Sequence, residues 1–183
     1  NDPQGERVFK ESTAFLLTST MEDVVSEGTG TGFRLDNMHV AGKTGTANDY
    51  RDLTFAGYTP YYTAAIWAGY DEPQDLPESH RRFHRTLWKN VMNRIHEELP
   101  DKEFEQPSTV VRKAVCANSG LLAGTGCTRV YEYFDQDNVP ERTCTAHRPS
   151  MTPKTDKGNS SGNSSKKKAY ANWWEYYWDQ IWG

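Results

Sequence analysis

The fold of this 183-residue chain is decided by one stretch, Val40-Ala41-Gly42-Lys43-Thr44-Gly45-Thr46-Ala47-Asn48-Asp49. Residues 38–47 are predicted to form a strand, because no helical pattern follows Thr46 and a second strand-like run begins at Leu53. Residues 53–58 and 62–70 are rich in aromatic and small residues, and Pro60 between them marks a tight turn. Three strands so close in sequence predict an antiparallel meander.

The same stretch also matches the end of a phosphate-binding loop. In the pattern G-x-x-x-x-G-K-[ST], Gly42-Lys43-Thr44 supplies the last three positions, but the first glycine falls at Asn37. Such a loop also opens a helix, whereas a strand is predicted here. A P-loop nucleotide-binding protein is therefore kept only as a rival function.

The residue types around Lys43 suit the recognition of a peptide that ends in a carboxylate. A substrate peptide can pair with an exposed strand edge, and Gly45 carries no side chain to block its approach. Pleating places Thr44 and Thr46 on one face, where two hydroxyls can bind one carboxylate. Lys43 adds a positive charge that attracts the carboxylate and lowers the pKa of nearby hydroxyls. A backbone N–H near Thr46 is a candidate oxyanion donor.

Besides residues 40–49, three segments are informative: Gly28-Thr29-Gly30-Thr31, Phe55-Ala56-Gly57-Tyr58-Thr59-Pro60 and Trp67-Ala68-Gly69-Tyr70-Asp71. Together the four segments resemble the C-terminal half of the transpeptidase domain in bifunctional, class A penicillin-binding proteins. The resemblance covers residues 1–99 well and reaches more loosely to 149. It implies an α/β fold of the penicillin-binding transpeptidase (serine β-lactamase-like) type, an antiparallel sheet flanked by helices with a C-terminal extension. It also implies catalytic roles for Lys43 and Thr46, and substrate binding by Thr44, Gly45 and Thr46.

The family's nucleophile box, Ser-x-x-Lys, has no convincing match in this chain. Ser164 and Ser165 precede Lys167 and Lys168 by three residues, but in a Lys-rich stretch that cannot activate a hydroxyl. Ser-x-Asn is also absent upstream of Lys43. We therefore expect both boxes, an export signal and a membrane anchor on an upstream segment, and an inactive chain when that segment is missing.

The resemblance implies a peptidoglycan D,D-transpeptidase on the extracytoplasmic face of a bacterial membrane. Its partners would be stem peptides ending in D-Ala-D-Ala, β-lactam antibiotics and the upstream part of the same protein, and no cofactor is expected. The same boxes serve D,D-carboxypeptidases, in which water resolves the acyl-enzyme. A non-catalytic module on residues 100–183 that binds cell wall or membrane surface is a second rival.

Two helices are predicted, over residues 10–27 and 80–98, because each range carries an apolar stripe. Four regions are also predicted along the chain. The regions are the transpeptidase part (1–99), a Cys-containing extension (100–149) without strong periodicity, a flexible Ser/Lys/Gly linker (150–169) and an aromatic tail (170–183). The first stripe comprises Ala14, Leu17, Met21, Val24 and Val25, and the second comprises Phe83, Leu87, Val91 and Ile95, widened by Trp88 and Met92.

Cys116, Cys127 and Cys144 make an odd count, and in an exported protein one disulfide plus one free thiol is the default. Proximity slightly favours Cys116 with Cys127. Zinc is the alternative, because Cys144-Thr145-Ala146-His147 has ligand-like spacing and the other two cysteines would complete a Cys3His set. We expect no metal, since this pair alone is a weak signal. The other histidines, His39, His80, His84 and His96, are assigned no metal role.

Composition excludes further function classes. The net charge of −4 gives no reason to expect nucleic-acid binding. No run of about 18 apolar residues exists, so no membrane-spanning helix is predicted. The aromatic tail and the Lys166-Lys167-Lys168 run beside it predict contact with a membrane surface or a cell-wall polymer.

Overall fold

The computed structural model describes residues 5–147. The predicted linker over 150–169 and the aromatic tail over 170–183 lie outside the described residues. The chain divides into two compact units, Asn1–Val110 and Val111–Gly183. Within the described part, no helix has the length and apolar character needed to cross a membrane.

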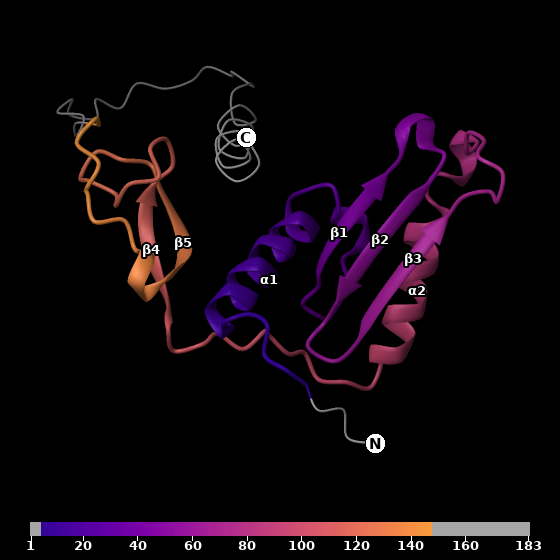
Figure 1. The fold of residues 1–183 in the computed structure, drawn as a ribbon, viewed down its shortest axis with the longest axis horizontal. Coiled ribbons are helices and arrows are strands. Elements are labelled where there is room, and N and C mark those ends of the chain that lie inside the picture. The colour runs from indigo at the N-terminus through magenta and orange to yellow at the C-terminus, as the bar shows by residue number, and fades with distance from the viewer. Residues whose placement is uncertain (1–4, 148–183) are drawn as a thin grey trace, which may run out of the picture. The chain divides into compact units, whose positions relative to one another are not determined.

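The first unit is built on a three-stranded antiparallel sheet (Figure 1). The strand order is β1-β2-β3, and Lys43 lies opposite Ala56 while Gly45 lies opposite Thr54. The backbone N–H of Thr59 donates to the carbonyl of Tyr62 at 2.8 Å and closes the predicted turn around Pro60. The predicted meander is confirmed, with β1 at Ala41–Thr46, β2 at Leu53–Tyr58 and β3 at Thr63–Ala68.

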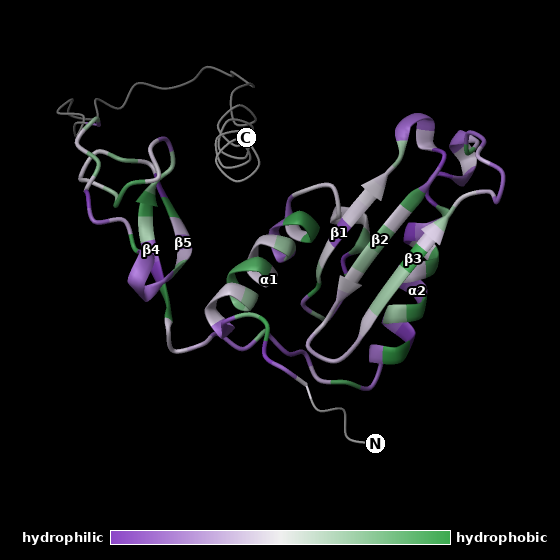
Figure 2. Cartoon of the chain, in the orientation of Figure 1, coloured by the Kyte–Doolittle hydropathy of each residue, from purple (hydrophilic) through white to green (hydrophobic). Residues whose placement is uncertain are grey.

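Two helices flank this sheet, and both were predicted. Helix α1, Glu11–Ser26, packs against β1, whereas α2, Phe83–His96, packs against β3 and β2. Short 3-10 turns connect the elements at Thr31–Phe33, Asn48–Tyr50 and Glu78–His80. The unit therefore has the expected α/β architecture, and its β2 and β3 strands are mostly hydrophobic (Figure 2).

Aromatic rings form the centre of the core. Phe33 stacks on Phe55 with ring centroids 3.7 Å apart, and Trp88 meets Phe55 edge-on at 4.9 Å. The Trp88 indole N–H donates to the carbonyl of Ala64 at 3.0 Å, which satisfies its one polar group inside the core. Aliphatic and thioether side chains complete the cluster: Val25, Leu35, Met38, Val40 and Met92.

The predicted buried face of α2 is only partly correct: Trp88 and Met92 are buried as expected, but the main row of the predicted stripe is not. The buried row is His84, Trp88, Met92 and His96, while the row of Phe83, Leu87, Val91 and Ile95 is exposed. His96 stays inside because both ring nitrogens are bonded. Its Nδ1–H donates to the Met92 carbonyl at 2.7 Å, and Nε2 accepts from the Thr59 hydroxyl at 2.8 Å.

The predicted stripe of α1 is also only partly buried. Val25 lies in the core as expected, but Leu17 is 56 % exposed. Ser12 and Phe15 are buried instead. On the neighbouring turn the Thr18 hydroxyl lies 2.8 Å from the hydroxyl of Tyr58 in β2, so this side of the helix is the one that contacts the sheet.

The second unit contains two strands that the sequence did not predict. Strands β4, Val110–Cys116, and β5, Arg129–Asp135, form a two-stranded sheet, and a 3-10 turn follows at Gln136–Asn138. The Arg112 guanidinium lies over the rings of Tyr131 and Tyr133, at 5.4 and 5.6 Å. The run Val130, Tyr131, Tyr133 and Phe134 is rich in β-branched and aromatic residues, which is a strand signal that was available in the sequence.

Candidate functional site

Lys43–Thr46 lie on β1, which is an edge strand of the described sheet. Its only partner in the described sheet is β2. The backbone N–H of Ala47 donates to the carbonyl of Asp52 at 2.9 Å, which makes this a hydrogen-bonded pair. Antiparallel ladders alternate, so Gly45 and Lys43 direct their backbone groups at β2. The N–H and C=O groups of Thr44 and Thr46 therefore point to the open edge.

The Lys43 ammonium reaches this open edge. Strand alternation places its side chain on the face opposite Thr44 and Thr46. The exposed side chain nevertheless turns toward the edge, where Nζ donates to the Thr44 carbonyl at 2.9 Å. The Lys43 ammonium and the outward-pointing backbone groups of Thr44 and Thr46 thus lie side by side along the open edge of β1.

The two predicted hydroxyls share a face but differ in environment. The Thr44 hydroxyl is 2.8 Å from the Thr29 hydroxyl, which comes from the glycine-rich turn after α1. Thr46 is exposed at the end of the strand. Sequence reasoning missed Thr29 as a site residue, although it lies in one of the four segments that carry the resemblance.

Gly45 is required for a reason that the sequence did not reveal. A Cβ at this position would lie 2.3 Å from the hydroxyl of Thr54 on β2. That hydroxyl also donates to the Gly45 carbonyl at 3.3 Å. The glycine therefore accommodates a neighbouring side chain, in addition to leaving the strand open to a substrate.

The turn after β1 is held by several side chains. Asp49 and Tyr50 both adopt left-handed backbone conformations, with φ of 61° and 57°. The Arg81 guanidinium lies 4.0 Å from the centre of the Tyr50 ring, and Arg51 Nε lies 3.2 Å from an Asp75 oxygen. A turn fixed in this way holds the last residue of β1 in place.

A shallow groove of ≈ 480 Å³ crosses the sheet beside the site. Small residues of all three strands line it, together with the half-exposed Trp67. The Trp67 indole N–H donates to Asp52 at 2.9 Å, which fixes the ring. The lining residues that share the face of Lys43 are Gly45, Thr54, Ala56, Ala65 and Trp67.

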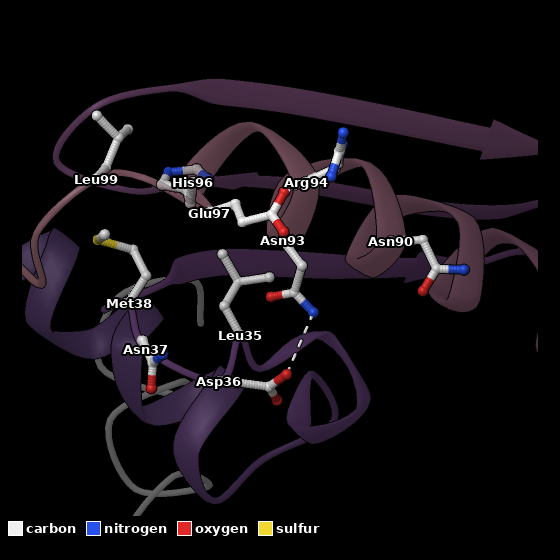
Figure 3. Close-up of a pocket in the computed structure, with 10 residues that line it drawn as sticks. All are labelled: Leu35, Asp36, Asn37, Met38, Asn90, Asn93, Arg94, His96, Glu97 and Leu99. Carbon is white, nitrogen blue, oxygen red and sulfur yellow. Dashed lines mark hydrogen bonds and ion pairs between the residues drawn. The ribbon is translucent and has the colours of Figure 1, made fainter.

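A second hollow lies between residues 35–38 and α2, and it contains none of the predicted site residues (Figure 3). Asp36 receives hydrogen bonds there from Lys89 at 3.0 Å and from Asn93 at 3.5 Å. These contacts fasten the segment before β1 to α2. They give this hollow a structural role.

The geometry does not favour the nucleotide-binding rival. Gly42-Lys43-Thr44 lies inside β1, and only a three-residue 3-10 turn follows the strand. A phosphate-binding loop needs the N-terminus of a helix directly after its Lys-Thr pair. Among the described residues, no such helix begins there.

The three cysteines predicted as candidates for a disulfide come together in the second unit. All three are free thiols, and His147 lies among them, with the four ligand atoms within 4.8 Å of one another. Hydrogen bonding, chiefly with the Ser119 side chain, lowers the pKa of the Cys144 thiol to about 7. The disulfide stays a prediction, whereas the C-x-x-H spacing is the signal that identified His147 in advance.

Two protein families match the chain. Residues 1–93, just over half of it, match the penicillin binding protein transpeptidase domain. Residues 106–149 match the penicillin-binding protein 1A C-terminal domain.

Curated relatives extend this similarity over most of the chain. Penicillin-binding protein 1A of Clostridium perfringens is 34 % identical over 169 residues, which covers 87 % of this chain and 20 % of the relative. Penicillin-binding protein 1A/1B of Bacillus subtilis is 30 % identical over 190 residues, covering 87 % and 21 %. The chain thus spans about a fifth of the length of these relatives.

A solved structure shows the same fold. The crystal structure of penicillin-binding protein 1A from Haemophilus influenzae superposes with a TM-score of 0.65 at 23 % sequence identity. The match covers 76 % of this chain and 22 % of that one.

Proposed function

This chain belongs to the penicillin-binding protein family, as the C-terminal part of a transpeptidase domain of the 1A type, and we propose that it supplies the substrate-binding strand of a peptidoglycan D,D-transpeptidase. In this reaction a serine attacks the carbonyl of a donor D-Ala-D-Ala peptide and D-alanine leaves. An amine of a second stem peptide then attacks the acyl-enzyme and releases the serine. The chain contributes the strand that holds the donor.

The observation that carries this proposal is the open edge of β1. A donor peptide can add to this edge through the backbone groups of Thr44 and Thr46. The Lys43 ammonium, 2.9 Å from the Thr44 carbonyl, lies where a terminal carboxylate needs a positive charge. The outward N–H of Thr46 is placed to donate to the oxyanion of the tetrahedral intermediate.

The serine and its general base come from an upstream part of the domain. The exposed row on α2 supports this assignment, because Phe83, Leu87, Val91 and Ile95 are 59, 41, 49 and 45 % exposed on one helix face. Four large apolar side chains in a row suit packing against another part of the same domain. The export signal and the membrane anchor are assigned to the upstream part as well, with the assembled enzyme on the extracytoplasmic face.

Reconstitution with an upstream transpeptidase segment that carries Ser-x-x-Lys and Ser-x-Asn tests the proposal. A fluorescent penicillin acylates the serine and remains attached on a denaturing gel. We expect labelling only when both pieces are present. Lys43→Ala should slow acylation by about 100-fold, the typical loss for one electrostatic contact to the transition state.

Lys113→Ala is the matched control, because Lys113 is an exposed lysine on β4 in the other unit. It should leave the labelling rate unchanged. Full-rate labelling of the upstream segment alone, or equal rates for the wild type and Lys43→Ala, would contradict the proposed role of β1.

A further inference from the structure

Three cysteines and one histidine meet at one point of the second unit. Cys116 ends β4, Cys127 lies in the turn before β5, and Cys144 and His147 follow Gln136–Asn138. Their three sulfur atoms and a ring nitrogen all lie within 4.8 Å of one another. Residues 116 and 147 are separated by 31 positions, so the fold itself brings the group together.

The position of the His147 nitrogen is the decisive detail. Nδ1 lies 3.5 Å from Cys116 Sγ, 3.4 Å from Cys127 Sγ and 3.4 Å from Cys144 Sγ. A ring nitrogen offers either one N–H or one lone pair, so it cannot hydrogen-bond three sulfurs at once. These three nearly equal distances, with all four atoms within 4.8 Å of one another, indicate that the atoms surround a common centre.

These distances match a tetrahedral zinc site. With Zn–S bonds of about 2.3 Å and Zn–N bonds of about 2.0 Å, tetrahedral angles separate nitrogen and sulfur by about 3.5 Å. We propose that Cys116, Cys127, Cys144 and His147 bind one zinc ion. Thiolate and imidazole ligands select zinc over calcium or magnesium, which prefer oxygen. Four protein ligands close the coordination sphere, so the ion is structural.

Main-chain hydrogen bonds tie the backbone around the cluster together. The N–H of Cys116 donates to the Leu121 carbonyl and the N–H of Cys144 to the Leu122 carbonyl, both at 2.8 Å. The N–H of Ala117 donates to the carbonyl of Thr128, beside Cys127, at 2.9 Å. A Cβ at Gly124 would lie 2.3 Å from the Cys144 carbonyl oxygen, so the turn approaches the third cysteine very closely. The ligands are therefore held near their final positions.

The second unit also needs such an ion. Within its described residues, the buried apolar side chains are Val115, Cys116 and Cys144, and the regular structure is a two-stranded sheet. A two-stranded sheet is marginally stable by itself, and small units without a core use metals or disulfides instead. Because two of the three buried side chains are the proposed ligands, the ion takes the place of the missing core.

Zinc content and thiol protection of the wild-type chain test the site. The full 183-residue chain should retain about one zinc per chain after dialysis, and cobalt should replace it. We expect thiolate-to-cobalt charge transfer and the intense visible bands of tetrahedral cobalt. All three thiols should resist alkylation until a chelator is added. These measurements need no variant, so a folding defect cannot obscure them.

Substitution of the ligands localises the ion. Cys127→Ser and His147→Ala should each weaken zinc binding at least 10-fold, whereas His80→Ala, at an exposed histidine of the first unit, should bind as the wild type does. The proposal would be overturned if all three thiols were alkylated with zinc present. It would also be overturned if the chain bound no zinc and its measured mass were lower by two hydrogen atoms, the loss that accompanies disulfide formation. The second outcome would establish the disulfide instead.

Discussion

A Cβ atom added to Gly45 would lie 2.3 Å from Oγ1 of Thr54, the residue directly across the β1–β2 pair. The same hydroxyl donates to the Gly45 carbonyl, so the two residues are coupled through both packing and hydrogen bonding. This relationship locates the strand that bears Lys43 relative to the rest of the sheet.

Gly45→Ala should therefore destabilise the β1–β2 pair by about 1–3 kcal/mol, the usual cost of overpacking. In a Thr54→Ala background the added Cβ no longer meets the Thr54 hydroxyl. Gly45→Ala should then destabilise the β1–β2 pair by less than about 1 kcal/mol. Hydrogen exchange of peptides that cover residues 41–58 measures both values. Equal costs in the two backgrounds would show that Thr54 is not the obstacle.

The hydroxyl of Thr46 can be separated from its backbone N–H by two substitutions. Thr46→Val keeps the shape of the side chain and removes the hydroxyl, while Thr46→Ser keeps the hydroxyl. A hydrogen bond to a carboxylate contributes about 1.5–3 kcal/mol, so Thr46→Val should slow penicillin acylation of the reconstituted domain about 10- to 100-fold. Thr46→Ser should remain close to the wild type. If both variants acylate normally, only the backbone of Thr46 takes part.

Because one row of α2 is exposed and the neighbouring row is buried, substitutions at adjacent residues should have different effects on stability and on association with the upstream segment. Val91→Glu should change the free energy of unfolding by less than about 0.5 kcal/mol, because Val91 is 49 % exposed. It should nevertheless abolish association with the upstream segment. Met92 is the next residue and is fully buried, so Met92→Ala should lower the free energy of unfolding by about 2–5 kcal/mol.

Urea unfolding and co-purification with the tagged upstream segment measure the two effects. Asn90→Glu is the control for added charge, because Asn90 is an exposed polar residue on the same helix. Association that survives Val91→Glu would mean that the upstream part packs elsewhere.

His84 predicts how stability depends on pH. Burial, and secondarily the charge of Arg85, lowers the pKa of His84 below its usual 6.5, and Nδ1 has no hydrogen-bond partner among residues 5–147. The unfolded chain thus binds a proton that the folded chain excludes. The contribution of His84 to stability is complete above pH 6.5 and decreases as the pH falls from 6.5 toward the lowered pKa.

His84→Phe should reduce the drop in melting temperature between about pH 7.5 and about pH 5.5. Phenylalanine fits the same surroundings, since His84 already lies 5.4 Å from the Phe33 ring. The matched control, His80→Phe at an exposed position, should retain the full drop. An undiminished drop in His84→Phe would assign the pH dependence to other groups.

The meander was predictable because its signals are local. The strand run that ends in Lys43–Thr46, the aromatic strands that follow and the turn at Pro60 require no knowledge of distant contacts. The buried face of α2 was only partly predictable, because the predicted stripe contained Trp88 and Met92 but not the polar residues His84 and His96. The choice of buried row depends on Trp88, which reaches the Ala64 carbonyl on β3, and on His96, which bonds to Thr59. Both partners lie far away in sequence.

The cysteine cluster shows a similar division. The pair Cys144 and His147 has a recognisable spacing, but nothing local relates it to Cys116 or Cys127. Their convergence depends on turns: the backbone of Gly120 has φ of 67°, and Gly124 lets the chain pass close to Cys144. Such geometry is set by contacts between segments. The spacing of the cysteines and the histidine in the sequence therefore did not predict that all four side chains converge.

Asn118 offers the finest test of this site, because it contacts the ring nitrogen of His147 that faces away from the sulfurs. The Asn118 side-chain nitrogen Nδ2 lies 3.3 Å from His147 Nε2. If Nδ1 binds zinc, Nε2 carries the proton, so the Asn118 amide must turn over by about 180° to present its oxygen as the acceptor. Asn118→Ala should then weaken zinc binding about 10-fold, the lower end of the usual loss when a partner of a ligand histidine is removed. Asn118→Asp, which keeps an acceptor oxygen, should bind zinc at least as tightly as the wild type in competition with a chromophoric chelator. Equal loss in both variants would contradict the proposed acceptor role of Asn118 at Nε2.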